Sequence, residues 1–442
     1  MNLSNKAIKI KDFDFYPIII VFVVLLSYVR IYLLHDAYWD DNAWLLSIYA
    51  SNNLEEFLNT GFYELRRAPL GIFLYNLFIL HRITDHAYLI WHSISMGIQI
   101  ATPIFLYLFI KNLFKDKQLL SFFAALSLVV FPLDTTLPYL SGINYRIATL
   151  LTLISFYLTQ RSFAKGGTRW SLLLMALAIS SLSHYIFLEL TIVFELPRLF
   201  IIGYIFYKEG TEGKALIKKT LTYWLPFFIL CIPLVIYKLT YKPYGIYGGI
   251  YKTDFFFLLN WREHREAIRM LLFRGWRILF PYINNVTFWS VLPSVFAAVI
   301  GFLALVKLPS IFRNKSEKKL KNNLRRTLII LLGGIIFLIP PIFLLEFAGR
   351  EIGPGMNSSH FAPAQIGYAI ILGSLLYFIY IVYCSLHLKV RWIYFFIAIL
   401  IGFGVFFNNL YLDIYFKSSE RQEMFWQAFT DRFPSLPEKA VF

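Results

Sequence analysis

Long apolar stretches recur along the 442-residue chain and are separated by shorter polar or mixed segments. Stretches of about 17–25 residues fit one helical crossing of a bilayer. Their apolar residues are continuous rather than alternating, which excludes a transmembrane barrel. The pattern therefore predicts an all-α polytopic membrane protein with eleven transmembrane helices. We expect these helices near residues 17–34, 87–110, 119–133, 141–160, 170–187, 189–207, 221–240, 289–306, 327–346, 362–386 and 392–411.

The segments between the predicted spans differ in charge from one side of the membrane to the other. With a cytoplasmic N-terminus, all five inner segments are rich in Lys and Arg, as the positive-inside rule expects: "KNLFKDK", "RSFAKGGTR", "KEGTEGKALIKK", "KLPSIFRNKSEKKLKNNLRR" and "HLKVR". Two of the outer segments are long, residues 35–86 and 241–288. We predict one transmembrane domain over residues 1–411 and a short outer tail over 412–442, with an amphipathic stretch that stops at Pro434.

Composition narrows the class of protein further. Hydrophobic residues make up 58% of the chain, and the net charge of +16 comes mostly from the predicted inner segments, so no nucleic-acid partner is implied. Cys231 and Cys384 fall inside apolar runs, which argues against a disulfide framework. The first apolar run lacks a small-residue cleavage site and is expected to be a retained span. The many Lys, Asn, Ile and Phe residues favour a bacterial inner membrane, and we expect a monomer.

The first long outer segment carries unusual residues directly after an apolar run. Asp40 and Asp41 follow the first span in "HDAYWDDNAW". "NNLEEFL" offers Asn53 as the N-cap of a short helix that lies on the membrane surface. Arg66 and Arg67 then precede a Pro-Leu pair in "RRAPL". Acids and bases thus gather where the chain is expected to leave the membrane.

This arrangement resembles that of the GT-C glycosyltransferases, which include the lipid A aminoarabinose transferase and the protein O-mannosyltransferases. The resemblance implies transfer of a monosaccharide from a polyprenyl-phosphate carrier to a lipid, glycan or protein acceptor on the outer, periplasmic or extracellular, face. It aligns Asp40 with the catalytic base and Asp134 in "FPLDTTLPYLSGINYR" with a second acid. Arg67 stands where relatives have a lysine, and His360 in "NSSHFAP" stands where they often have "RYxxP".

The chemistry of such a transfer makes the same residues candidates. An acceptor must be activated and an anionic leaving group stabilised, so we predict Asp40, Asp41 and Asp134 as catalytic residues. The fork of donors on arginine suits the carrier phosphate. The predicted phosphate-binding residues are Arg66, Arg67, His360 and three arginines expected on one face of an interfacial helix, Arg262, Arg265 and Arg269.

A divalent cation is a further candidate component of this site. His35, Asp40, Asp41, Glu351 and His360 would provide ligands if the outer loops converge, although no ligand spacing in the sequence indicates such a site.

Other interpretations stay open at this point. The loop acids also suit helix capping, the arginines also suit lipid head-group anchoring, and Arg198 three residues after Glu195 predicts an ion pair beside Pro197. His184 and Glu189 flank a tight outer turn. An O-antigen-type polymerase or ligase is the second enzyme class, although its long functional loop usually comes late in the chain. A lipid or sugar transporter is the non-enzyme alternative, often marked by repeats and mid-membrane charges.

Overall fold

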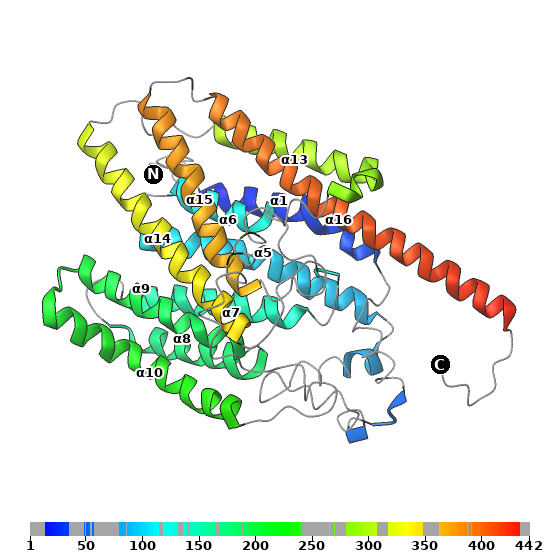
Figure 1. Cartoon of the computed structure of the whole chain (residues 1–442), viewed down its shortest axis with the longest axis horizontal. Helices are drawn as coiled ribbons and strands as arrows, with labels where there is room; N and C mark the ends of the chain where they lie inside the picture. Colours follow the sequence, from blue (N-terminus) through cyan, green and yellow to red (C-terminus); the bar gives the residue numbers. More distant parts are fainter. Residues whose placement is uncertain are drawn as a thin grey trace, which may run out of the picture.

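The computed structural model describes a chain built from helices. It describes residues 14–34, 48, 50–53, 55–56, 79–84, 86–114, 118–130, 136–138, 142–163, 168–187, 189–240, 265, 269, 280–306, 317–347, 362–386, 389 and 391–433. No strand occurs within these ranges. The longest helices form a tilted bundle (Figure 1).

The labelled helices follow the order of the apolar runs. They are α1 (Tyr16–Tyr28) with the 3-10 turn η2 (Val29–Leu33), α5 (Ala87–Leu113), α6 (Gln118–Val130), α7 (Ile143–Ser162), α8 (Trp170–Leu182) with the π-helix η4 (Ser183–Phe187), the 3-10 helix η5 (Glu189–Phe194) with α9 (Glu195–Lys208), α10 (Gly213–Thr240), the 3-10 helix η9 (Phe280–Asn285), α13 (Phe288–Val306), α14 (Glu317–Phe347), α15 (Ala362–Ser385) and α16 (Arg391–Arg432).

Nine helices in the described part of the chain are long and apolar enough to cross a membrane. The prediction of an all-α polytopic membrane protein is therefore confirmed. The other two predicted spans contain α6, which has 13 residues, and α7, which is long enough but carries Arg146, Arg161 and a row of hydroxyl side chains. The count of eleven crossings stays a prediction.

Three helices run well beyond the apolar stretches that predict them. α10 and α14 begin inside two of the basic inner segments, at Gly213 and Glu317. Lys, Glu, Leu and Arg are good helix formers, so these polar residues extend a helix as readily as they form a loop. α16 continues through the expected tail to Arg432, two residues before Pro434, which disfavours helical backbone in the residue before it.

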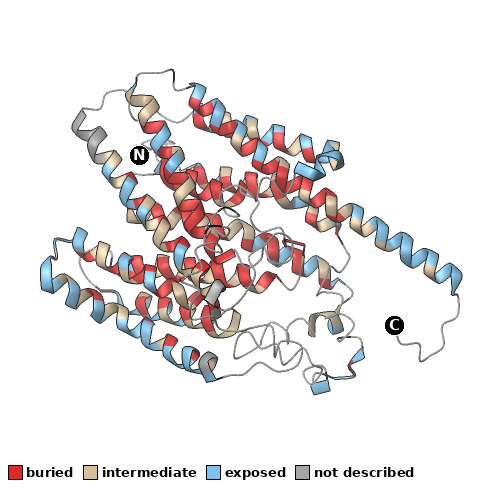
Figure 2. Cartoon of the chain, in the orientation of Figure 1, coloured by how far each residue is buried: buried red, intermediate tan, exposed pale blue. Residues whose placement is uncertain are grey.

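The centre of the bundle is α6, a short helix with no polar face. Eleven of its 13 residues are buried. α1, α5, α15 and α16 all pack against it, and Figure 2 shows the buried residues concentrated in this middle region, while the end of α16 is exposed. A helix buried on all sides needs apolar residues all round, which the sequence of α6 supplies.

Glycines bring the neighbouring helices close to α6. A methyl group added at Gly373 of α15 would overlap the backbone of Ala124, and one added at Gly404 of α16 would overlap Val130. Small residues at such crossings let helix backbones approach closely, which gains dispersion energy where no hydrophobic effect drives helix association.

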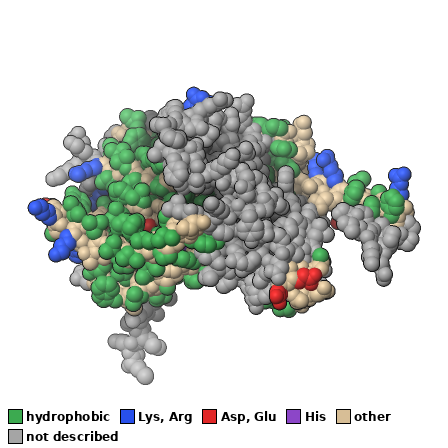
Figure 3. Space-filling view, turned by 60° about the horizontal axis from the view of Figure 1, so that its bottom comes forward, with side chains coloured by type: hydrophobic (Ala, Val, Ile, Leu, Met, Phe, Trp, Pro, Cys, Tyr) green, Lys and Arg blue, Asp and Glu red, His purple; other side chains and the backbone are tan. Residues whose placement is uncertain are grey.

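The outward faces of the helices are apolar as well. Phe22, Leu174, Ile229 and Phe296 are each at least 50% exposed. Figure 3 shows a broad area of hydrophobic side chains with Lys and Arg at its margins. An exposed apolar surface of this extent is unfavourable in water and fits contact with lipid.

Polar contacts join the start of α1 and the ends of α5 and α9 at one face of the bundle. We call it the basic face because many Lys and Arg residues belong to it. Lys111 at the end of α5 pairs with Asp14 before α1 at 2.5 Å. Lys208 at the end of α9 donates to the carbonyl oxygen of Leu113 at 3.1 Å. The described Lys and Arg residues at helix ends that the predicted topology assigns to this side are Lys111, Arg161, Arg169, Lys208, Lys214, Lys218, Lys219, Arg325, Arg326, Lys389 and Arg391.

The opposite helix ends meet at a second face, which we call the loop face. Asp413 of α16 accepts from Arg30 after α1 at 2.6 Å and from Thr287 before α13 at 2.9 Å. The ring Nε2 of His92 in α5 lies 2.9 Å from the carbonyl oxygen of Leu34. The two faces therefore hold the helix ends that the predicted topology assigns to opposite sides of the membrane.

We expect Gly373→Ala to destabilise the protein by about 1–3 kcal/mol, because the added methyl group overpacks the crossing of α15 with α6. The matched control is Gly333→Ala in α14, where an added methyl group meets no atom within 4 Å. Thermal unfolding in detergent measures both. Equal unfolding temperatures for the two variants would contradict the close packing at Gly373.

We expect single cysteines at Lys214 and Glu420 to react with a membrane-impermeant maleimide from opposite sides. Both positions are exposed, Lys214 near the basic face and Glu420 beyond the loop face. The background carries alanine at Cys231 and Cys384, the two free thiols. Labelling of both cysteines in intact cells would show that the assignment of the two faces is wrong.

Candidate functional site

Most of the sequence-predicted site residues lie outside the described part of the chain. These are His35, Asp40, Asp41, Arg66, Arg67, Asp134, Arg262, Glu351 and His360, and their roles stay predictions. Arg265 and Arg269 are described. Both have helical backbone and exposed side chains, four residues apart.

The described residues of the first long segment form a capped helix start and a contact with the chain before α5. Asn53 accepts from the backbone N–H of Glu56 at 2.9 Å, and the Glu56 carboxylate accepts from the backbone N–H of Asn52 at 2.7 Å. The predicted N-cap is confirmed, although the return bond reaches Asn52 instead of Asn53. Arg82 donates to the carbonyl oxygens of Ile48 and Ser51. The bonds from Arg82 tie residues just before the Asn53 cap to the chain that enters α5.

His81 adds an uncharged ring to this region. Its ring meets that of Tyr88 edge to face, with the ring centroids 5.7 Å apart. Burial lowers the pKa of His81, because a charged imidazolium loses hydration there. The ring is therefore neutral at pH 7 and above.

Arg146 lies on the first turn of α7 and is 4% exposed. Its Nη2 donates to the hydroxyl of Thr136 at 3.0 Å. Its Nη1 lies 3.5 Å from the hydroxyl of Ser95 and 3.4 Å from the carbonyl oxygen of Leu137. A methyl group at Gly142 would come within 3.3 Å of Nη2, so glycine leaves room for the guanidinium. These contacts fix the orientation of a buried charge.

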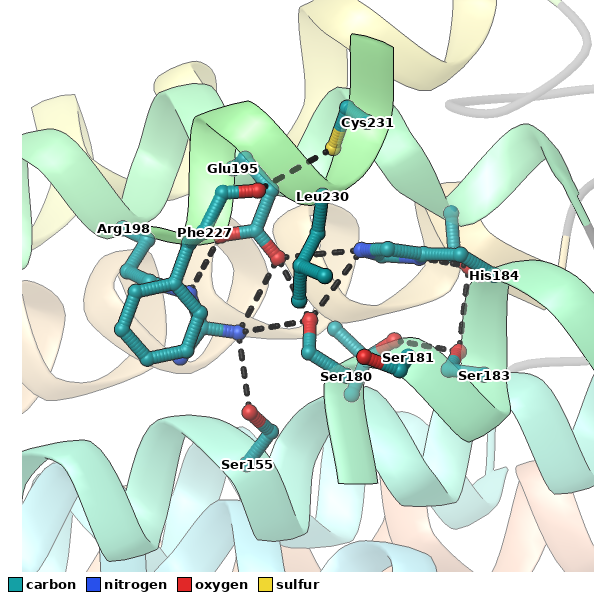
Figure 4. Close-up of polar contacts among 12 residues, drawn as sticks. Ser155, Ser180, Ser181, Ser183, His184, Glu195, Arg198, Phe227, Leu230 and Cys231 are labelled. Atoms are coloured by element: carbon teal, nitrogen blue, oxygen red, sulfur yellow. Dashed lines mark hydrogen bonds and ion pairs between the residues drawn. The ribbon is translucent and has the colours of Figure 1, made fainter. Parts of the chain in front are cut away.

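A second buried charge cluster lies deeper, between α7, α8, η4 and α9 (Figure 4). Glu195 is 3% exposed. Its Oε1 accepts from Ser180 at 2.6 Å and lies 3.1 Å from the Nε2 of His184. Its Oε2 pairs with the Nε of Arg198, so the predicted Glu195–Arg198 ion pair is confirmed. In lipid such a charge is costly unless its partners are close and well oriented.

Arg198 is fully buried and is held on every side. It donates to the hydroxyls of Thr159 at 2.6 Å and Ser155 at 2.9 Å, both from α7. Its guanidinium also lies 4.6 Å from the ring centroid of Phe156 and 4.1 Å from that of Phe227, two cation–π contacts. The pair is therefore neutral overall and links α9 to α7 and α10.

His184 completes the cluster, but its geometry is not that of a catalytic triad. The hydroxyl of Ser180 and the carboxylate of Glu195 both lie near Nε2, at 3.0 and 3.1 Å. A nucleophile activated by His needs the hydroxyl on one ring nitrogen and the orienting carboxylate on the other. Nδ1 instead lies 2.8 Å from the hydroxyl of Thr191. This geometry fits a structural role better than catalysis of hydrolysis. We call the cluster of Ser180, His184, Glu195 and Arg198 the brace.

Irregular backbone places these side chains. The π-helix Ser183–Phe187 and the 3-10 helix Glu189–Phe194 stand on either side of residue 188. They bring Ser183 within 3.0 Å of Thr191 and 3.2 Å of Thr152. Such backbone occurs at membrane depth where it is buried in protein, as it is here. The broken helical hairpin is thus held by hydroxyl groups of α7.

The sequence contains a signal for this polar surface. Hydroxyl residues recur at steps of three or four along the predicted span 141–160 and its end, which puts them on one helix face. All are buried: Thr149, Thr152, Ser155, Thr159 and Ser162. Arg146 stands at the start of the same row, and an ionisable residue inside a span is by itself a candidate for function.

The comparisons add no relative to this description. No family of known proteins matches the chain, and neither does any curated protein or any solved structure. Within the described ranges, no group of three or more His, Cys, Asp or Glu side chains is placed to hold a metal ion.

We expect Glu195→Gln to destabilise the protein by roughly 3–5 kcal/mol, because it leaves the buried Arg198 without its negative partner. The matched control is Glu209→Gln, which weakens an exposed pair with Lys219 at 3.7 Å and should cost less than about 1 kcal/mol. Unfolding in a detergent titration measures both.

A paired replacement tests the same brace from the other direction. Glu195→Leu combined with Arg198→Met removes both charges and should recover most of the lost stability. Unchanged stability in Glu195→Gln would show that the brace does not stabilise the fold. Unchanged stability together with loss of activity would make the cluster functional.

Proposed function

We propose that this protein is a membrane-embedded glycosyltransferase of the GT-C kind. It transfers a monosaccharide from a polyprenyl-phosphate carrier to a lipid, glycan or protein acceptor. The proposal is supported by contacts at the loop face, which join the end of α1, the start of α5, the start of α13 and Asp413 of α16. The predicted topology assigns the helix ends that border residues 35–78, 131–135, 241–264 and 348–361 to this same face. Those segments contain nearly all of the predicted acids and bases.

The proposed reaction assigns a separate role to each predicted group. Asp40 takes the proton of the acceptor as its oxygen or nitrogen atom attacks C1 of the sugar. The bond from C1 to the phosphate oxygen breaks, and polyprenyl phosphate leaves. Asp134 orients the acceptor, and Asp41 orients it or holds a divalent cation. Arg66 and Arg67 stabilise the negative charge on the leaving phosphate.

The remaining predicted cations have supporting roles in this proposal. The exposed side chains of Arg265 and Arg269, four residues apart, suit the predicted basic helix face that also includes Arg262. His360 binds the carrier phosphate in this proposal. The basic face, with its Lys and Arg residues, is taken as cytoplasmic, which puts the reaction on the periplasmic or extracellular side of a bacterial inner membrane.

A transporter is the second candidate, favoured by one observation. The hairpin from α8 to α9 is broken by π and 3-10 turns beside a buried Glu–Arg pair. Discontinuous helices with buried charges are typical of transporters. The charges of Glu195 and Arg198 are satisfied by each other and by hydroxyls, which favours the brace. Movement of a labelled lipid across proteoliposomes without chemical change would favour transport.

We expect purified protein, incubated with a panel of polyprenyl-phosphate monosaccharides, to release free polyprenyl phosphate, and Asp40→Asn to abolish the release. Mass spectrometry detects the product and identifies the donor. The matched control is Glu55→Gln, an exposed acid of the same outer segment.

The outcomes separate the candidate classes. Full activity in a folded Asp40→Asn variant would overturn the role of Asp40 as the base. Reaction only with diphosphate-linked oligosaccharides would indicate the polymerase or ligase. No reaction with any donor, together with lipid movement, would indicate the transporter.

A further inference from the structure

The end of α16 carries large apolar side chains beyond the loop face. After Asp413 the helix continues to Arg432, and its far end is exposed (Figure 2). Phe425 is 60% exposed, Trp426 is 55% exposed and Phe433 is 48% exposed. Aromatic side chains of this size are usually enclosed in proteins, because they contribute much of the energy of cores and interfaces. Their exposure here therefore calls for a partner surface.

Membrane lipid does not explain this surface. α16 runs alongside α13 and continues past the loop-face end of that span (Figure 1). The exposed Trp289 marks the level of the outer head groups, and Asp413 reaches that level through its bond with Thr287. At about 1.5 Å per residue, Trp426 lies roughly 20 Å beyond Asp413 along the axis. A head-group layer is only about 5–8 Å thick, so these rings lie in water.

The exposed aromatic residues follow the spacing of a coiled-coil seam. Five residues separated by alternating steps of three and four lie on one face of the helix: Ser419, Gln422, Trp426, Phe429 and Phe433. The rings contact one another, with centroids 5.8 Å apart for Trp426 and Phe429 and 5.1 Å apart for Phe429 and Phe433. Phe425 widens this face at one edge. We call Phe425, Trp426, Phe429 and Phe433 the aromatic stripe.

We infer that the aromatic stripe joins two copies of this chain through a parallel pair of α16 ends outside the membrane. The inference replaces the monomer that the sequence predicts. It is independent of the proposed glycosyl transfer, because it uses only the described part of α16 and the shared orientation of two copies in one membrane.

Charge at the edges of the seam favours this pairing. Glu423 lies along one edge of the seam and Arg432 along the other, and both side chains are exposed. In a parallel pair of identical helices, each edge faces the opposite edge of the partner, whereas an antiparallel pair brings like edges together. Parallel pairing therefore sets an acidic edge against a basic one. It is also the only direction open to two α16 ends that leave the same membrane on the same side.

Gln422 gives the pair a register. It lies inside the seam, one turn before Trp426. An amide carries both a donor and an acceptor, so the two Gln422 side chains of an in-register parallel pair can bond to each other. In a shifted register each amide would face an apolar ring and lose hydrogen bonds to water. A polar residue within a seam commonly fixes register and the number of helices in this way.

The short seam is helped by how α16 is held. A free peptide of this length is marginal as a helix. Here the helix is already formed, because it continues a span whose loop-face level is fixed by the bonds of Asp413 with Arg30 and Thr287. Pairing then costs little ordering of the chain. Confinement of both copies to one membrane also raises their effective concentration.

The test measures energy transfer between copies of the full chain in proteoliposomes at several protein-to-lipid ratios. Donor and acceptor dyes are attached to Glu420→Cys, which points away from the seam, in a background with alanine at Cys231 and Cys384. We expect Trp426→Glu to weaken association at least tenfold, because two carboxylates would meet in the seam. The matched control is Met424→Glu, since Met424 is 68% exposed on the opposite face of the helix, and it should associate normally.

A cross-linking experiment tests the direction and register of the pair. Oxidation should link two copies through Gln422→Cys, because seam positions at the same level lie within disulfide distance in a parallel pair. Glu420→Cys, two residues away but outside the seam, should stay unlinked. Equal cross-linking of the two variants would overturn the parallel register.

The remaining outcomes decide between occupants of the stripe. Transfer that Trp426→Glu leaves unchanged, or that Met424→Glu reduces equally, would overturn the pairing. Quenching of a dye on Gln422→Cys by nitroxide lipids would assign the stripe to the membrane and overturn it as well. Association that requires deletion of residues 434–442 would show that the end of the chain covers the stripe, which also contradicts the inference. Unfolding temperatures equal to that of the parent chain confirm that both glutamate variants are folded.

Discussion

The bundle depends on the close approach of four helices to α6. In lipid, helices gain little from excluding water, so their association relies on dispersion contacts and on polar bonds between them. Gly373 and Gly404 provide the dispersion part by bringing two backbones against α6. Asn408 provides a polar part by donating to the carbonyl oxygen of Val129 at 3.0 Å. The positions of the loop-face helix ends follow from these central contacts.

The second constraint is that each buried charge must find its partners inside the bundle. The Glu195–Arg198 pair meets this requirement with hydroxyls from α7, and the bond from the Trp224 indole N–H to the backbone oxygen of Glu195, at 2.7 Å, adds α10. α7 is thus a polar helix inside an apolar bundle. Its hydroxyl row bonds the broken hairpin at depth, and its first turn holds Arg146 at the loop face. One helix therefore links the buried Glu195–Arg198 pair to the loop face.

Much of the fold follows from the sequence because apolar runs and helix caps are local signals. The eleven expected ranges all contain helix, and the Asn53 cap and the Glu195–Arg198 pair follow from spacings of three residues. The central place of α6 was not predictable, since a helix surrounded by protein and one facing lipid are equally apolar. The partners of Arg146 were missed because Ser95 lies 51 residues away in the sequence. The predicted catalytic acids lie outside the described residues, so their convergence stays a prediction.

The last helix has a mechanical consequence. α16 is continuous from Arg391 to Arg432, and Asp413 anchors it at the loop face through Arg30 and Thr287. At about 1.5 Å per residue, the 19 residues after Asp413 extend roughly 28 Å along the axis. They end in an exposed aromatic stripe that includes Phe425 and Trp426. A helix anchored this way acts as a lever arm, so a load at its tip would apply a torque to three membrane helices at once.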